Sequence, residues 1–231
     1  MKIIQTPSQN FDERRQPLSM LVLHYTGMET GQAALSRMCD PDAKVAAHYM
    51  VEEDGRVFQL VDEGKRAWHA GVGSWCGLED INSRSIGVEI VNGGHDYGLP
   101  DFPDVQILAV VKLCKEIVGR HAINADNIIG HSDISPGRKL DPGEKFPWKR
   151  LAENEIGLWP VSDEGALSVG HLHMLSDIGY GISEQPDAQE VRDFMVAFQQ
   201  RWMPENVTGE ACVDTLARVF QIADLYRKFR N

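Results

Sequence analysis

Residues 129–143 constrain this chain most, because they place three groups suited to metal chemistry in one segment without helical or strand periodicity. The segment carries His131, Lys139 and Asp141 together with two prolines and three glycines. Proline and glycine at this density predict a loop of fixed shape rather than a helix or a strand. A catalytic zinc ion takes three protein ligands from His, Asp, Glu or Cys and keeps one position open. We therefore expect His131 and Asp141 to bind zinc, with Lys139 beside the ion and a third ligand from elsewhere.

Length and charge exclude some alternatives. A chain of 231 residues can bury a full core and has room for one large domain and a small one. The formal net charge of −11 argues against nucleic acid as a partner, because phosphate binding requires a basic surface. The cysteines are too widely spaced to suggest a disulfide framework or a thiolate zinc site. They are Cys39, Cys76, Cys114 and Cys212.

The hydropathy pattern bears on location. No apolar run approaches the roughly 20 residues of a membrane span, so no membrane span is expected. The first 15 residues lack the apolar core and the small-residue cleavage site of a signal peptide. These observations predict a cytoplasmic location. The alternative is a periplasmic location, if the chain has lost an export signal.

A third zinc ligand can come from the end of a predicted strand. Residues 20–23 form a short apolar run that predicts a buried strand closed by Gly27. His24 lies at the C-terminal end of that strand, where a rigid scaffold can present a functional side chain across the sheet. The alternative for His24 alone is a core histidine that bonds to the backbone.

The remaining pattern predicts an α/β fold. Residues 46–51 and 57–61 flank the sequence Glu53-Asp54-Gly55, a strong hairpin signal. Helical patterns cover residues 30–38 and 104–119, and residues 85–92 alternate as a strand. This last strand turns its odd-numbered residue Glu89 away from the apolar face. Glu89 is therefore either exposed to solvent or buried because it has a functional role.

Glu89 and Lys139 complete a possible hydrolytic site. A carboxylate with a raised pKa can take a proton from water and return it, so Glu89 is the candidate base. A cation near the scissile carbonyl stabilises the tetrahedral oxyanion, so Lys139 is the candidate for that role. The alternatives are a solvated strand face for Glu89 and an exposed loop position for Lys139.

Several motifs in fixed order carry a resemblance to a known family. They are residues 23–26 (LHYT), 47–49 (AHY), 66–71 (RAWHAG), Asn82 with 85–89 (SIGVE), 130–133 (GHSD) and 138–143 (RKLDPG). Together they resemble the zinc-dependent N-acetylmuramoyl-L-alanine amidases of the amidase-2 family, over about residues 15–155. Aspartate at position 141 and glutamate at position 89 match the bacterial branch. The phage branch has a cysteine at position 141 and a tyrosine where this chain has Ala47.

The resemblance implies a fold and a reaction. The fold would be a central mixed β-sheet flanked by helices, with one Zn2+ on His24, His131 and Asp141. Glu89 and Lys139 would be catalytic. The reaction would be hydrolysis of the amide bond between N-acetylmuramic acid, or its 1,6-anhydro form, and L-alanine of the stem peptide, in cell-wall turnover or recycling. The substrate would be peptidoglycan or a muropeptide. Family motifs that border the groove imply substrate-binding or supporting roles for His48, Trp68, His69 and Asn82.

The C-terminal part predicts a small helical domain. A linker at residues 159–165 precedes helical patterns at residues 171–180, 188–201 and 212–227. The expected division is a zinc amidase catalytic domain at residues 1–159 and a three-helix domain at residues 160–231. The second resembles a peptidoglycan-binding domain. A competing reading of the whole chain is a non-catalytic muropeptide-binding module of the same fold, which would lack a metal ligand.

Overall fold

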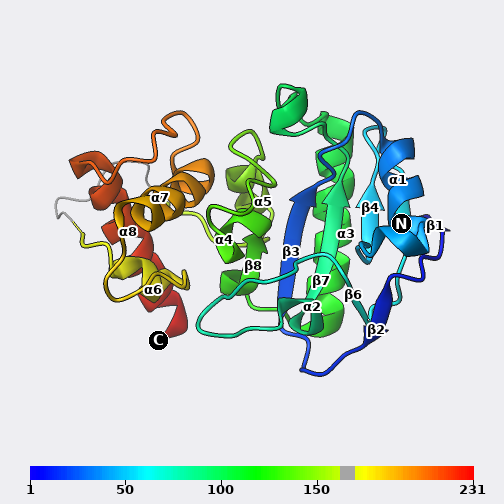
Figure 1. Cartoon of the computed structure of the whole chain (residues 1–231), viewed down its shortest axis with the longest axis horizontal. Helices are drawn as coiled ribbons and strands as arrows, with labels where there is room; N and C mark the ends of the chain where they lie inside the picture. The colour runs from blue at the N-terminus through cyan, green and yellow to red at the C-terminus, as the bar shows by residue number, and fades with distance from the viewer. Residues whose placement is uncertain (162–169) are drawn as a thin grey trace.

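A six-stranded mixed sheet forms the centre of the computed structural model, which describes residues 1–161 and 170–231. In chain order its strands are β1 (Ile3–Gln5), β3 (Met20–Tyr25), β4 (Tyr49–Val51), β5 (Val57–Gln59), β7 (Ser85–Ile90) and β8 (Ile128–Gly130). Their spatial order is β1-β5-β4-β7-β3-β8 (Figure 1). Strands β4 and β5 pair antiparallel, whereas the other neighbours are parallel. A separate antiparallel pair joins β2 (Phe11–Glu13) to β6 (Lys65–Ala67).

Helices cover both faces of this sheet. They are α1 (Gly31–Cys39), α2 (Ile81–Arg84), α3 (Asp104–His121), α4 (His131–Ile134), α5 (Trp148–Glu153), α6 (Met174–Ile178), α7 (Ala188–Trp202) and α8 (Val213–Arg230). Residues of α3 and α5 share a buried cluster with one face of β3, β4 and β7. Residues of α1 pack on the opposite face of β4 and β5. The predicted α/β fold with a central mixed β-sheet flanked by helices is confirmed.

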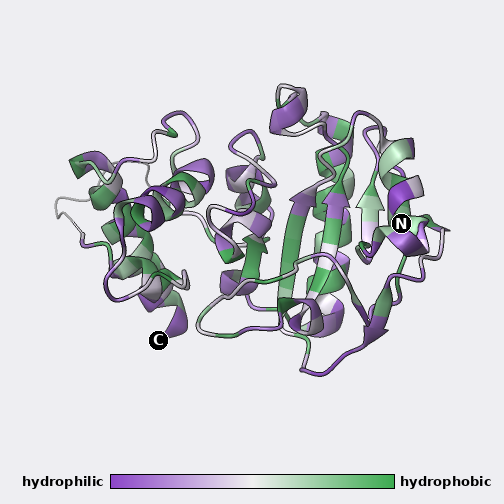
Figure 2. Ribbon diagram, viewed as in Figure 1, coloured by the Kyte–Doolittle hydropathy of each residue, from purple (hydrophilic) through white to green (hydrophobic). Residues whose placement is uncertain are grey.

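The alternation predicted for residues 85–92 holds in β7. Ile86, Val88 and Ile90 are buried in the α3 cluster, and Val91 faces the α1 cluster. The middle strands are mostly apolar and become polar toward their carboxyl ends (Figure 2). In the parallel pairing of β3 with β7, His24 lies directly beside Glu89. Paired residues on neighbouring strands share a face, so these two polar side chains rise together at the carboxyl ends of their strands.

The prediction for residues 129–143 needs a correction. Residues 128–130 are strand β8, and residues 131–134 form one helical turn, α4, rather than a loop. The carboxylate of Asp133 accepts a hydrogen bond from the Gly130 N–H at 2.8 Å and so closes this turn. An acidic side chain near a helix start stabilises the helix, and the prolines and glycines of the segment all lie outside residues 131–134.

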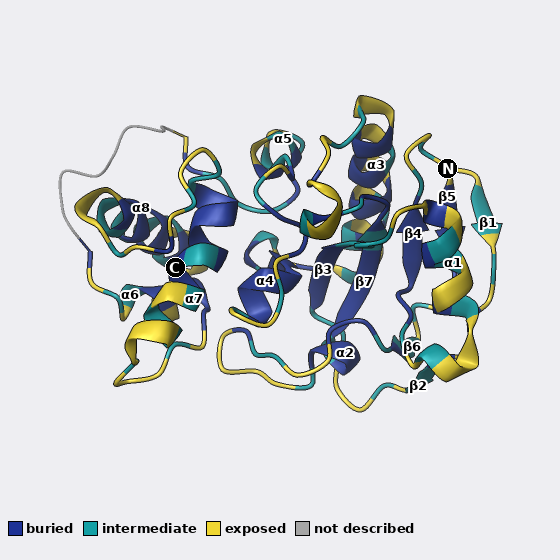
Figure 3. Ribbon diagram, turned by 45° about the horizontal axis from the view of Figure 1, so that its top comes forward, coloured by how far each residue is buried: buried dark blue, intermediate teal, exposed yellow. Residues whose placement is uncertain are grey.

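The C-terminal helices do not form a separate core. Met20, Val22 and Ile129 of the sheet share one buried cluster with residues of α6, α7 and α8. Figure 1 shows these helices beside β8 and α4, and Figure 3 shows that the facing surfaces are buried. The first predicted C-terminal helix is shorter than expected, Met174–Ile178, because it begins three residues later and ends at Gly179. The predicted linker lies mostly outside the described residues, since residues 162–169 are not described.

Candidate zinc site

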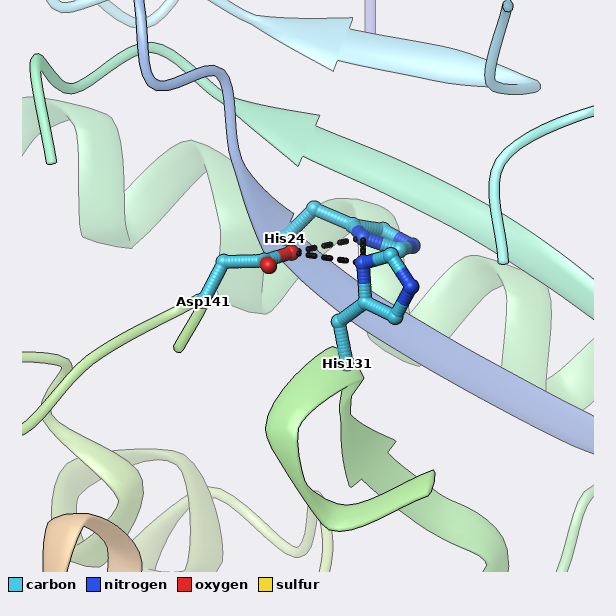
Figure 4. Close-up of side chains that lie close together, drawn as sticks. All are labelled: His24, His131 and Asp141. Carbon is cyan, nitrogen blue, oxygen red and sulfur yellow. Dashed lines mark hydrogen bonds and ion pairs between the residues drawn. The ribbon is translucent and has the colours of Figure 1, made fainter. Parts of the chain in front are cut away.

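Three buried side chains converge at the carboxyl end of β3. His24 is the penultimate residue of that strand, His131 begins α4, and Asp141 follows in the next loop (Figure 4). His24 Nδ1 lies 3.0 Å from His131 Nδ1, and Asp141 Oδ2 lies 2.8 Å and 3.0 Å from these two nitrogens. The three residues are between 1% and 6% exposed. The fold therefore brings together the three residues that the sequence nominated as zinc ligands.

The donor set fits a zinc ion. Two imidazole nitrogens and one carboxylate oxygen are ligands that zinc accepts in hydrolytic enzymes. With bond lengths of about 2.0–2.1 Å, tetrahedral ligand atoms lie about 3.3 Å apart. The observed separations of 2.8–3.0 Å are slightly shorter, so a small outward shift of the side chains would accommodate the ion.

Hydrogen bonds on the far side of each imidazole leave its Nδ1 lone pair available. His131 Nε2 lies 2.8 Å from the Ala70 carbonyl, which can only accept, so this nitrogen carries the proton. For His24 the series of hydrogen bonds is longer. Ser85 Oγ donates to the Ile81 carbonyl at 2.6 Å, so it accepts from His69 Nε2 at 3.1 Å. His69 Nδ1 then accepts from His24 Nε2 at 3.0 Å.

The electrostatics keep these groups in their metal-binding forms. Burial, reinforced by the neighbouring His131, lowers the pKa of His24 to about 4. Burial also holds the pKa of His69 well below its usual range. Although burial acts in the opposite direction on a carboxylate, His131 and His24 hold the pKa of Asp141 below its usual range. At neutral pH the His24 imidazole is thus neutral and the Asp141 carboxylate is charged, as metal binding requires.

The His69–Ser85 relay leads to a first prediction. Replacing His69 by alanine should weaken zinc affinity about 10- to 100-fold, because such partners orient a ligand and increase its basicity. Ser85→Ala should weaken zinc affinity in the same direction by a smaller factor. Competition with a chromophoric chelator measures the affinity. The matched control is His121→Ala, since His121 pairs with Glu63 and neither residue lines the two cavities. Unchanged affinity in His69→Ala would remove the relay from the metal site.

Glu89 lies in the groove beside the three ligands. It lines a cavity of about 430 Å3 together with His131, Lys139 and Asp141, and a second cavity of about 320 Å3 next to it. Its Oε2 atom is buried and has no hydrogen-bond partner among the described residues. Burial and the nearby Asp141 raise the pKa of Glu89 well above its usual range, while Lys139 opposes the shift. This environment suits a group that accepts and returns a proton.

The four residues predicted to border the substrate have different surroundings. His69 lines the cavity next to the three ligands. Asn82 is 6% exposed, and its Oδ1 accepts from the backbone N–H groups of His69 and Ala70 at 3.1 Å and 2.7 Å. It therefore positions the segment that supports both histidine ligands. Trp68 is half-buried and does not line either cavity.

His48 has no surface to offer a substrate. It is 0% exposed, its Nδ1 accepts from the Gly87 N–H at 2.9 Å, and its Nε2 donates to the Lys65 carbonyl at 3.0 Å. Direct substrate contact, one of the two roles expected for it, does not fit this burial. The supporting role fits. A Cβ atom built on Gly87 would lie 2.4 Å from His69 Cγ, so His69 packs closely on the strand at Gly87. By accepting the Gly87 N–H, His48 fixes the strand on which His69 packs.

The burial of His48 gives a second prediction, on stability. Burial lowers its pKa in the folded protein to about 3, whereas the unfolded value is about 6.5. Between these values the unfolded state binds the extra proton, so stability falls as the pH falls. At pH 5 this one group should cost about 2 kcal/mol relative to pH 8. Urea unfolding measures the free energy of unfolding at the two pH values. The difference between them should be smaller for His48→Gln than for the native protein, and equal differences would contradict the prediction.

Some supporting residues were given no role from the sequence. Ser85 and Ala70 lie in the ordered motifs, but their roles depend on partners from other segments. Tyr25 and His95 also line the cavity, with Tyr25 Oη 3.0 Å from His95 Nδ1. Arg138 Nη2 donates to the Ala70 carbonyl at 2.7 Å. Arg138 begins the motif at residues 138–143, next to Lys139, and this position is the sequence signal that could have identified it.

Comparisons with known proteins agree with this geometry. The family model for N-acetylmuramoyl-L-alanine amidase matches residues 14–144. The N-acetylmuramoyl-L-alanine amidase AmiD of Escherichia coli K12 is 32% identical over 97% of this chain and 91% of AmiD. The structure of E. coli AmiD in complex with anhydro-N-acetylmuramic acid-L-Ala-D-γ-Glu-L-Lys superposes with a TM-score of 0.81, at 30% identity, over 95% of this chain and 99% of AmiD. AmpDh3 of Pseudomonas aeruginosa gives a TM-score of 0.83 at 32% identity, over 92% of this chain and 93% of AmpDh3.

Three of these matches include the C-terminal helices, since each extends over more than nine-tenths of the chain. The chain therefore belongs to the N-acetylmuramoyl-L-alanine amidase family, as its ordered motifs predicted. No helix among the described residues is long and apolar enough to cross a membrane.

Proposed function

We propose that this protein is a zinc-dependent amidase that cleaves the bond between N-acetylmuramic acid, or its 1,6-anhydro form, and L-alanine of the stem peptide. The observation that carries the proposal is the buried His24–His131–Asp141 cluster, with Glu89 and Lys139 on the wall of the same cavity. The complex of E. coli AmiD with an anhydro-muropeptide supports this substrate class.

Each group of the site has its own role in the proposed hydrolysis. A zinc ion on the three ligands would lower the pKa of a water molecule and polarise the substrate carbonyl. Glu89 accepts the proton of the attacking water at a carboxylate oxygen and returns it to the leaving amine of L-alanine. Lys139 contributes a positive charge where the carbonyl oxygen becomes an oxyanion. Glu89 and Lys139 both line the cavity, so both groups can reach the same substrate amide.

The test is direct hydrolysis. Purified protein is incubated with soluble 1,6-anhydro-muropeptide or intact sacculi, and released stem peptide is detected by mass spectrometry. We expect cleavage at the lactyl–L-alanine amide, loss of activity on chelation, and recovery on adding Zn2+. Binding of muropeptide without cleavage would support the competing reading, a muropeptide-binding module. Comparison of the two substrates also decides between recycling of fragments and turnover of the intact wall.

The domain division and the location are further parts of the proposal. The family model ends at residue 144, whereas the AmiD match extends over 97% of the chain and so includes the proposed C-terminal unit at residues 160–231. Residues of the sheet and of α6, α7 and α8 form one buried hydrophobic cluster, so this unit packs directly on the catalytic part. Wall binding by these helices, and the cytoplasmic location, stay predictions.

A further inference from the structure

Two residues of the C-terminal unit contact the helical turn that carries a zinc ligand. The turn is α4, which begins with His131 and has Asp133 as its third residue. Arg201, near the end of α7, places Nη1 2.6 Å from Asp133 Oδ2. Tyr180, just after α6, donates its hydroxyl to Asp133 Oδ1 at 2.6 Å. Both carboxylate oxygens of Asp133 are thus engaged from outside the catalytic part.

This contact is fully buried. Asp133, Arg201 and Tyr180 are 1%, 2% and 2% exposed. The Arg201 guanidinium lies 4.2 Å from the Trp148 ring centroid and 4.6 Å from that of Trp202, so its plane is fixed by aromatic rings. Its Nη2 also donates to the Ile128 carbonyl of β8 at 3.1 Å. A charge pair in such surroundings has little freedom, and removal of one partner leaves the other charge buried and unpaired.

The same turn determines where two of the three ligands lie. Asp133 Oδ2 accepts the Gly130 N–H at 2.8 Å and closes the turn around His131. The next amide, Ser132 N–H, donates to the Asp141 carbonyl at 2.8 Å. A shift of α4 would therefore move His131 and the backbone of Asp141 together, while His24 stayed in the sheet.

We propose that Arg201 and Tyr180 are positioning residues for the zinc site, so that the C-terminal helices hold α4, and with it His131 and Asp141, in metal-binding geometry. The inference rests on the proposed zinc-dependent function. It gives the C-terminal unit a role in the chemistry in addition to any contact with the cell wall. If Arg201 and Tyr180 support the ligands, replacing either residue should lower zinc affinity and kcat. KM should change little, because neither residue lines the catalytic cavity.

The experiment uses the full chain with Arg201→Met and, separately, Tyr180→Phe. Zinc affinity is measured by competition with a chelator at a temperature where circular dichroism shows each variant folded. We expect Arg201→Met to bind zinc about 10-fold more weakly, the lower end of the loss seen when support of a metal ligand is removed. Tyr180→Phe should show a smaller loss. On soluble anhydro-muropeptide, kcat should fall and KM should change little.

Two further variants make the result specific. Arg227→Met removes an exposed ion pair with Asp177 in the same helical unit and should leave zinc affinity and kcat unchanged. Arg201→Lys keeps a positive charge near Asp133 and should recover part of the affinity. If the substitutions only reduced overall stability, the melting temperatures of the variants would fall, but their zinc affinities would not follow this order.

The inference is overturned if folded Arg201→Met and Tyr180→Phe bind zinc as tightly as the native chain. If Arg201→Met does not fold, Tyr180→Phe decides alone, because it removes one hydroxyl and keeps the ring packing; native zinc affinity in that variant overturns the inference. If the native chain itself binds no zinc, the proposed function fails first, and the inference fails with it.

Discussion

Replacing His131 or Asp141 by alanine should remove both zinc retention and amidase activity. Each of these residues supplies one of three buried ligand atoms, and two ligands alone do not hold a catalytic zinc ion. Activity should fall about 10³-fold or more, since several kcal/mol of transition-state stabilisation depend on the metal. Metal content is measured by mass spectrometry of the purified variants, and activity by release of stem peptide.

The control for this experiment is His171→Ala, which removes an exposed histidine of the C-terminal unit and should retain native zinc content and turnover. Native turnover in Asp141→Ala, or native protein that hydrolyses its substrate equally well after chelation, would rule out the proposed mechanism. Circular dichroism of each variant shows whether the sheet is intact, so that a loss of zinc is not confused with unfolding.

Replacing Glu89 by glutamine should separate chemistry from metal binding. The variant should keep its zinc, because Glu89 is not one of the three ligands, and should lose turnover about 10²- to 10⁴-fold, the usual contribution of a general base. The amide has nearly the same shape as the carboxylate but cannot take the proton from water. Zinc content and kcat, measured on the same sample, give the answer.

Glu29→Gln is the matched control, since Glu29 is an exposed carboxylate outside the cavity. Its turnover should equal that of the native chain. If Glu89→Gln retained full turnover, Glu89 would lose the role of base, and the buried, partnerless Oε2 atom would need another explanation.

Local patterns in the sequence determined most of the site. Short apolar runs predict strands, and the end of such a run placed His24 at a strand terminus, where the structure has it. Period-two alternation separated Glu89 from the apolar face of its strand, and β7 keeps that alternation. His131, Lys139 and Asp141 lie within eleven residues of one another, so their proximity follows from chain connectivity. The segment's helical turn was missed because prolines and glycines, the loop signals, lie on both sides of the four residues that Asp133 closes into a turn.

Only the tertiary structure decided the roles that depend on partners distant in the sequence. The His24–His69–Ser85 relay joins β3, the segment before α2, and β7. His48 resembles a groove residue in its motif, but packing of two strands around it leaves it fully buried. The contact of Arg201 with Asp133 joins residues 68 positions apart. Burial, tautomer and hydrogen-bond partner are properties of the folded surroundings, and a linear pattern of residue types does not encode them directly.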